Sequence, residues 1–132
     1  MSVKHKVSDM YGWQLDVATA MAEGWRRDDE DPTAWWPPAE IDYHDACASI
    51  TRDGIEAHFG YHPASNWAHG GPIIERERIT LTPLPEPAAA GHLSGWIATP
   101  QRYHGQHGSS ALEAAMRAYV ASKFGDEVEL PD

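Results

Sequence analysis

The first regular pattern in the chain is a stripe of apolar residues spaced three and four positions apart, which predicts an amphipathic helix near the N-terminus. The stripe comprises Trp13, Val17, Ala20 and Met21, followed by Gly24. Ser8 is a suitable N-cap residue, because its hydroxyl can accept a hydrogen bond from a free N–H group at the helix start. Gly24 readily takes the left-handed backbone conformation that ends many helices, so we expect the helix to stop there.

A second helix is predicted near the C-terminus. Ser110 and Glu113 have the spacing of a capping box, in which the hydroxyl and the carboxylate each satisfy a backbone N–H group. The apolar face of this helix comprises Leu112, Ala115, Met116 and Tyr119. Glu113 and Arg117 are four residues apart, a favourable spacing for an ion pair. Gly125 is the expected end of the helix.

Between the two helices, residues 46–61 alternate between apolar and polar positions and predict a β-hairpin. Asp53 and Gly54 favour a two-residue type I′ turn. With this turn, the apolar residues of both strands share one face, whereas a shift of one residue destroys that sorting. Shorter strands are predicted at residues 78–81 and 94–98.

The remaining segments carry turn and loop signals. Those predicted as connections without regular structure are residues 25–38, 83–91 and 103–108, which are rich in proline, glycine or charge. Residues 63–68 predict a turn into a short helix capped by Ser65 or Asn66. We expect residues 69–71 to break that helix and Pro72 to open a second short helical turn.

These elements predict an α+β fold. We expect a small antiparallel sheet of about four strands, with the N- and C-terminal helices packed on one face. The length of 132 residues suits a single domain over residues 1–132. Residues 25–45 and 83–91 are expected to be variable loops.

Charge and composition narrow the possible partners. The formal net charge is −10, which disfavours direct binding to nucleic acid or to an anionic membrane. The one cysteine, Cys47, excludes an internal disulfide framework and favours a reducing cytoplasm. No apolar window is long enough to span a membrane, and the N-terminus lacks a signal-peptide pattern. We therefore expect a cytoplasmic protein.

Two segments resemble a known family. Residues 65–76, SNWAHGGPIIER, resemble the hallmark of NinX-type proteins, which are small products of phages and prophages. Residues 112–128, LEAAMRAYVASKFGDEV, resemble the C-terminal signature of the same family. The helix ending at Gly24 and the strand around residues 96–98 also fit. The resemblance implies a phage origin and a location in the host cytoplasm, but no established activity and no catalytic residues.

The segment from Asn66 to Arg76 is the strongest candidate site. Gly70 and Gly71 before a helix start would expose backbone N–H groups, which bind anions such as phosphate. Trp67 would stack on a base, Arg76 or Arg78 would supply positive charge, and His104 would contact phosphate or ribose. In the alternative interpretation, the glycines only permit a tight turn and the indole fills the core. The segment fits neither a P-loop nor a dinucleotide-binding fingerprint.

The leading hypothesis is a non-enzymatic phage accessory protein that binds or sequesters a small nucleotide-like ligand, with a role against host defence. A homodimer is plausible, because a small ligand is held better between two surfaces than on one. The second hypothesis is a protein-binding inhibitor of a host factor. It would use Trp35 and Trp36 as an exposed pair, because they lie between proline breaks. Most indoles of the set Trp25, Trp35, Trp36, Trp67 and Trp96 are expected in the core. The acidic run at residues 28–31 would contribute to the same binding surface. In a variant of this hypothesis, the acidic protein mimics DNA and occupies a host nucleic-acid enzyme.

A small hydrolase is the third hypothesis. Its candidate acid–base residues are Asp42, His44, Asp45, Glu56 and His58, and Cys47 is a possible nucleophile. Nothing in the sequence brings any two of them together, so no catalytic residue is predicted. The pairs His58 with His62 and His104 with His107 lack the motifs of a zinc site. No metal and no cofactor are therefore predicted.

Overall fold

The computed structural model describes residues 3–27, 29–30, 34–36, 48–49, 61–85 and 94–130. The helical elements are a short 3-10 helix, η1 (Val7–Asp9), and the α-helices α1 (Gly12–Ala22), α2 (Trp67–Glu77) and α3 (Ala111–Phe124). The strands are β1 (Val3–Lys6), β2 (Arg26–Arg27), β3 (Ala34–Trp36), β4 (Ala48–Ser49), β5 (Thr80–Pro83), β6 (Trp96–Thr99), β7 (Gln106–Gly108) and β8 (Glu127–Leu130). The α+β class predicted from the sequence is confirmed.

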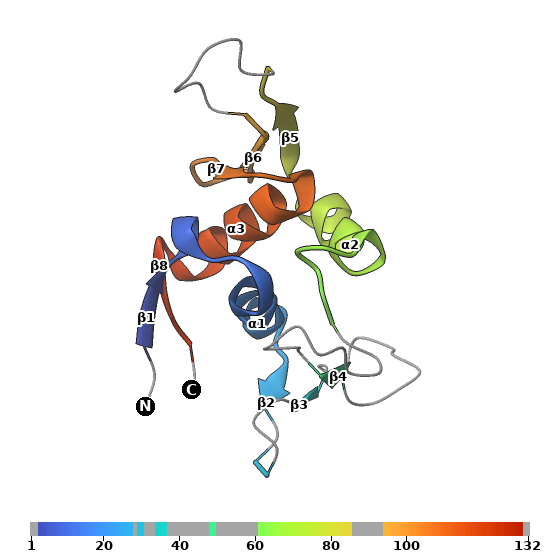
Figure 1. The fold of residues 1–132 in the computed structure, drawn as a ribbon, viewed down its shortest axis with the longest axis vertical. Coiled ribbons are helices and arrows are strands. Elements are labelled where there is room, and N and C mark those ends of the chain that lie inside the picture. The colour runs from blue at the N-terminus through green and yellow to red at the C-terminus, as the bar shows by residue number, and fades with distance from the viewer. Residues whose placement is uncertain are drawn as a thin grey trace.

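The strands form three small antiparallel sheets within the described ranges, instead of one sheet of about four strands (Figure 1). Their orders are β1-β8, β2-β3-β4 and β5-β6-β7. The sheets β2-β3-β4 and β5-β6-β7 lie at opposite ends of the long axis, with the helices between them. The helices therefore do not cover one face of a common sheet.

Helix α3 is the centre of the core. Nine of its fourteen residues are buried, including Leu112, Met116, Tyr119 and Val120. It contacts α1, α2 and the strands β5 to β8. Four of the buried residues between Ala114 and Ala121 are alanines, and these small side chains allow neighbouring elements to approach closely on several sides.

The predicted start and end of α3 are found with one difference. The Ser110 hydroxyl accepts a hydrogen bond from the Glu113 N–H at 3.1 Å. The Glu113 carboxylate accepts from the Ser109 N–H at 3.0 Å, one residue before the position that the capping box implies. The Glu113–Arg117 ion pair is present at 3.3 Å, and Gly125 ends the helix with a φ of +90°.

The N-terminal helix is also found, with a corrected start. The residue before α1 is Tyr11, and no side chain caps the helix. Ser8 lies in η1 instead, where the Met10 N–H donates to the Val7 carbonyl. Gly24 has a φ of +91° just after the helix, as the sequence predicted.

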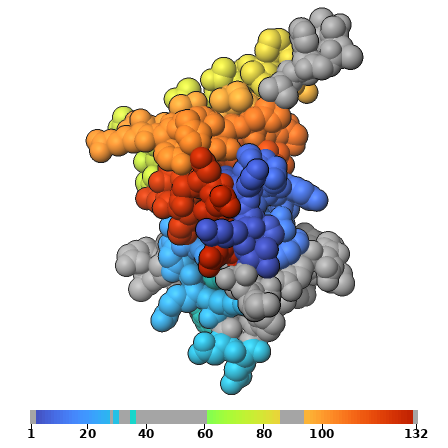
Figure 2. All heavy atoms as spheres, turned by 90° about the vertical axis from the view of Figure 1, so that its left-hand side faces the viewer, coloured from blue at the N-terminus to red at the C-terminus, as the bar shows by residue number. Residues whose placement is uncertain are grey.

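The two ends of the described chain pair with each other. In the β1-β8 ladder, His5 lies opposite Val128 and Val3 lies opposite Leu130. Figure 2 shows the N-terminal and C-terminal segments side by side. Val128 and Leu130 are buried, while Glu127 and Glu129 face solvent. Residues 127–130, for which no regular element was predicted, thus form a half-buried strand.

Two predicted loops contain strands. Residues 25–38 include β2 and β3, which pair with each other, and residues 103–108 include β7, which pairs with β6. Gly108 allows β7 to lie on α3, because a Cβ at that position would overlap the Ala114 backbone. The predicted strand at 94–98 is found as β6.

Other predicted elements lie wholly or partly outside the described residues. The turn at Asp53 and Gly54 and the second strand of the predicted hairpin are among them, and Ala48–Ser49 of its first strand pairs with β3. The strand predicted at 78–81 begins at Thr80, because Arg78 has a left-handed backbone conformation.

Candidate functional site

Residues 66–77 form one uninterrupted turn-and-helix unit. The Asn66 side chain caps α2 by accepting a hydrogen bond from the Ala68 N–H at 2.9 Å. The helix then continues through the two glycines and through Pro72 to Glu77. The prediction of a break at residues 69–71, with a second helix starting at Pro72, is therefore wrong.

The two glycines serve the helix and its packing. The Gly70 N–H donates to the Asn66 carbonyl at 2.9 Å, and Gly71 lies inside the helix, where N–H groups bond to the carbonyl four residues earlier. Gly70 is buried, and a Cβ there would overlap the Pro63 carbonyl and lie 2.6 Å from Leu112 Cδ2. The prediction that these residues expose free N–H donors is wrong, because the backbone uses them internally.

The aromatic candidates are placed apart. Trp67 is 55% exposed at the first residue of α2. It stands nine residues before Arg76, which corresponds to roughly 13 Å along a helix. Trp35 is 5% exposed and Trp36 is 41% exposed, because successive residues of a strand face opposite sides. The two indoles therefore do not form one exposed pair, and only Trp36 is available to a partner.

The candidate histidines in the described residues have polar partners within the chain. His104 Nε2 lies 2.9 Å from Asp126 Oδ1, and His107 Nε2 lies 2.6 Å from the Ser94 carbonyl. His62 Nδ1 lies 3.1 Å from Asp16 Oδ2. Within the described part of the chain, no group of three or more His, Cys, Asp or Glu side chains is arranged to hold a metal ion.

Several predicted candidates lie outside the described residues. These are Asp28, Asp31, Asp42, His44, Asp45, Cys47, Glu56 and His58. Asp29 and Glu30 of the acidic run are described, and both are exposed.

The structure has a cleft that the sequence did not predict. Its volume is about 480 Å³, and it lies between the C-terminal end of α2, the turn after β6 and the last turns of α3. The lining residues are Arg76, Glu77, Arg78, Ile79, Pro100, Gln101, Arg102, Tyr119, Ser122 and Lys123. Four of the ten basic residues of this acidic chain therefore line one cleft.

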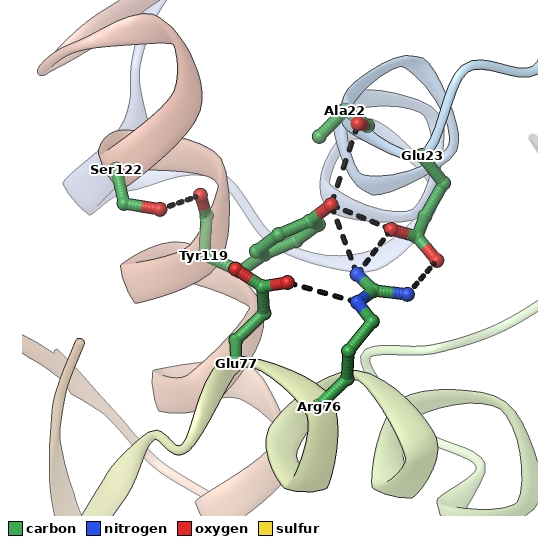
Figure 3. A network of polar contacts seen from close by, with 6 residues as sticks. All are labelled: Ala22, Glu23, Arg76, Glu77, Tyr119 and Ser122. Atoms are coloured by element: carbon green, nitrogen blue, oxygen red, sulfur yellow. Dashed lines mark hydrogen bonds and ion pairs between the residues drawn. The ribbon is translucent and has the colours of Figure 1, made fainter. Parts of the chain in front are cut away.

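Arg76 lies on one side of this cleft in a network that joins three helices (Figure 3). Its guanidinium donates to both carboxylate oxygens of Glu23, at 3.0 and 2.6 Å, and its Nε donates to Glu77 at 2.8 Å. The Tyr119 hydroxyl donates to Glu23 at 2.5 Å. We call Glu23, Arg76, Glu77 and Tyr119 the helix clamp, because they link the end of α1 with α2 and α3.

The electrostatics of the helix clamp hold Arg76 in its charged form. The hydrogen bond to Glu23 is the largest cause of a pKa raised above the usual value for arginine. Burial, followed by the hydrogen bond to Glu23, raises the pKa of Tyr119 and keeps its hydroxyl protonated. Since two carboxylates already neutralise Arg76, its charge is largely compensated before any ligand arrives.

The other three cations of the cleft are different. Arg78 and Arg102 have no ion-pair partner among the residues that the structure describes. Lys123 Nζ lies 5.7 Å from the centre of the Tyr119 ring. All three residues are exposed. The cleft thus presents three cations whose charge is not cancelled by a described carboxylate, and Arg78, Arg102 and Lys123 are called the free cations below.

A second polar cluster lies near the other end of α2. Asp16 is buried in α1, accepts a hydrogen bond from the Ala64 N–H at 3.0 Å and faces His62. The backbone N–H of His62 donates a hydrogen bond to His69 Nδ1 at 3.0 Å. Burial raises the pKa of Asp16 and lowers the pKa of His69. The cluster fixes the segment before α2 to α1.

The sequence did not reveal either group of contacts. The partners in the helix clamp are up to 96 residues apart, and Asp16 and His62 are separated by 46 residues. A usable signal for the cleft was the spacing of Arg76 and Arg78, which was interpreted only as a source of positive charge for a site at the glycines.

The described residues define a small α+β protein in which the buried helix α3 carries two further helices and a cation-lined cleft. The chain belongs to the family described as Bacteriophage P22, NinX, which matches residues 6–123. The family resemblance predicted from the sequence is confirmed. No curated protein matches the chain at a significant level. Within the described residues, no helix has the length and apolar character needed to cross a bilayer.

Proposed function

We propose that this phage accessory protein binds a small, phosphate-bearing, nucleotide-like ligand in the cleft at the C-terminal end of α2. The observation that carries the proposal is the concentration of basic residues there, on a chain with a net charge of −10. Arginine and lysine side chains are the usual partners of phosphate groups. The cleft volume of about 480 Å³ is within the range of pockets that hold small molecules.

The proposal moves the ligand away from the positions predicted from the sequence. Gly70 has no free N–H group to offer, and Trp67 and His104 do not line the cleft. Arg76 does line it, although the helix clamp engages its guanidinium. The free cations take over the role first assigned to the glycine amides.

In the infected cell, such a protein would act by holding its ligand unchanged. Sequestering a nucleotide-like signal is one way in which a phage protein can silence a host defence. Among the described residues of the lining, no acid–base pair accompanies the free cations, and the one acidic residue, Glu77, bonds to Arg76. This arrangement favours binding over turnover.

Calorimetric titration with ADP, ATP, ADP-ribose and cyclic dinucleotides tests the proposal. We expect at least one of them to bind in the micromolar range or tighter, and to be recovered chemically unchanged. Replacing Arg102 or Lys123 by glutamine should weaken that binding. Arg26→Gln removes a cation that does not line the cleft, and it should leave the affinity for the ligand unaltered. Failure of every member of the panel to bind would refute the proposal, and a converted product would establish an enzyme instead.

A host-protein inhibitor is a second candidate, favoured by the exposed indole of Trp36 on β3. Large exposed aromatic residues are common in the centres of protein interfaces. Its test is loss of inhibition of an isolated host factor by the variant Trp36→Ser, with Phe124→Ser, another exposed large apolar residue, as control.

A further inference from the structure

We infer that the cleft recognises the phosphate groups of its ligand rather than the base or the sugar, and that it takes a compound with two or more linked phosphates. This inference rests on the proposed function and goes further, because it names the part of the ligand that carries the affinity.

Among the residues that the structure describes, the lining offers no accessible aromatic ring on which a base can stack. The one aromatic residue of the lining is Tyr119, which is 2% exposed and has Arg76 and Lys123 each 5.7 Å from its ring centre. Ile79 is 7% exposed. Without an accessible ring among these described residues, the cleft lacks the aromatic stacking contacts through which proteins usually hold nucleobases.

Its accessible chemistry is cationic instead. The free cations come from three separate elements: Arg78 from the end of α2, Arg102 from the turn after β6, and Lys123 from the last turn of α3. Cations on three sides of one cleft suit a compact ligand with several negative charges, because each added phosphate group gains a partner. A single phosphate would leave part of this charge unmatched.

The backbone at Arg78 gives an independent argument. Arg78 has φ +53° and ψ +48°, and it is the one residue other than glycine with positive φ among the described residues. Helices that end in this left-handed conformation usually have glycine there, because a side chain causes strain. Strained residues of this kind cluster at ligand-binding sites. Arg78 lines the cleft, so an arginine at this position supplies a cation there, which a glycine would not.

The first experiment compares four probes by calorimetry with the wild-type protein: tripolyphosphate, pyrophosphate, ATP and adenosine. We expect tripolyphosphate to bind within about threefold of ATP, and adenosine not to bind, since the affinity is assigned to charged hydrogen bonds. Binding of ATP without binding of tripolyphosphate would overturn the inference and leave the proposed function standing. If none of these probes and no member of the nucleotide panel binds, both fail.

The second experiment tests Arg78 with variants that separate charge from backbone strain. Arg78→Gly removes both, Arg78→Ala removes the charge and keeps the strain, and Arg78→Lys keeps the charge. We expect Gly and Ala to weaken tripolyphosphate binding by roughly tenfold, the loss of about one charged hydrogen bond, with Lys in between. Circular dichroism checks that each variant is folded. Arg102→Gln, in the turn after β6, provides a second measurement of tripolyphosphate affinity after loss of a cation from another element.

Two further results would overturn the inference. One is unchanged tripolyphosphate affinity in both Arg78→Gly and Arg102→Gln. The other is a single-stranded oligonucleotide that binds more tightly than tripolyphosphate, which would assign the cleft to a polymer. The control Arg26→Gln makes the net charge more negative by the same single unit, so it separates a local contact from a general electrostatic effect.

Discussion

The two ends of helix α2 differ in what their residues do: those at the N-terminal end pack and bond within the protein, whereas those at the C-terminal end line a cleft. The N-terminal end carries the cap, the exposed indole and the glycine pair that attract attention in the sequence. There the backbone donors are engaged, and Gly70 is pressed against Pro63 and Leu112. The C-terminal end carries ordinary charged residues, yet it opens into the cleft. A glycine pair in a family hallmark can therefore be required by packing, while the accessible chemistry lies elsewhere on the same helix.

The largest expected effect comes from the packed end. Gly70→Ala should destabilise the protein by about 3 kcal/mol, because the added Cβ overlaps a backbone carbonyl that cannot move cheaply. Gly71→Ala is the matched control, since its Cβ would meet nothing closer than Trp67 Cε3 at 3.8 Å, and it should stabilise the helix by up to about 1 kcal/mol. Urea unfolding measures both. Equal effects of the two substitutions would contradict the division of roles.

The next effect tests the helix clamp, which borders the cleft. Glu23→Gln should destabilise the fold by about 2 kcal/mol, because it weakens charged hydrogen bonds to Arg76 and Tyr119. Glu75→Gln, on the exposed surface of the same region, should change stability by less than about 0.5 kcal/mol. Thermal unfolding of both variants provides the comparison. If Glu23→Gln left stability unchanged, solvent would already be screening the charged interactions of the helix clamp.

A smaller effect with the opposite sign is expected at the cleft end. Arg78→Gly should stabilise the protein by about 1 kcal/mol, because glycine adopts the left-handed conformation without strain. Arg78→Ala retains a Cβ and should give no such gain. Urea denaturation of the pair isolates the backbone contribution. Loss of stability in the glycine variant would show that the arginine side chain supports the fold.

The smallest effect concerns pH at the packed end. The pKa of His69 is lowered, first by burial and then by the charge of His62, so the unfolded chain binds a proton more readily than the folded chain. Stability from this group is therefore present above the ordinary value of 6.5 and is lost as the pH falls below it.

Replacing His69 by asparagine isolates this contribution. The shorter amide side chain would keep an acceptor for the His62 N–H, which donates to His69 Nδ1 in the wild type, but it does not titrate. The stability of wild type relative to His69→Asn should decline as the pH falls from about 7.5 to about 5.5, as followed by unfolding at several pH values. Asp16, whose pKa is raised, changes stability in the opposite direction and is common to both proteins. A constant difference across this interval would argue against a lowered pKa of His69.

Local patterns of residues predicted the features whose partners are close in the chain. The Ser110 cap, the Glu113–Arg117 pair and the glycine stops at both predicted helices were all present in the pattern. Strand β6 and the family membership were predictable for the same reason, because both depend on short contiguous segments.

The other features depend on contacts between segments that are distant in the chain, and these follow from the tertiary structure. The pairing of β1 with β8 joins residues such as His5 and Val128, and no local pattern encodes a partner so far away in the chain. Gly70 became a packing residue only because Pro63 and Leu112 lie against it. Arg76 was neutralised by Glu23 from another helix, whereas Arg78, two residues further on, remained available beside the cleft. Which cation is compensated depends on distances in space, and these follow from how the helices pack around α3.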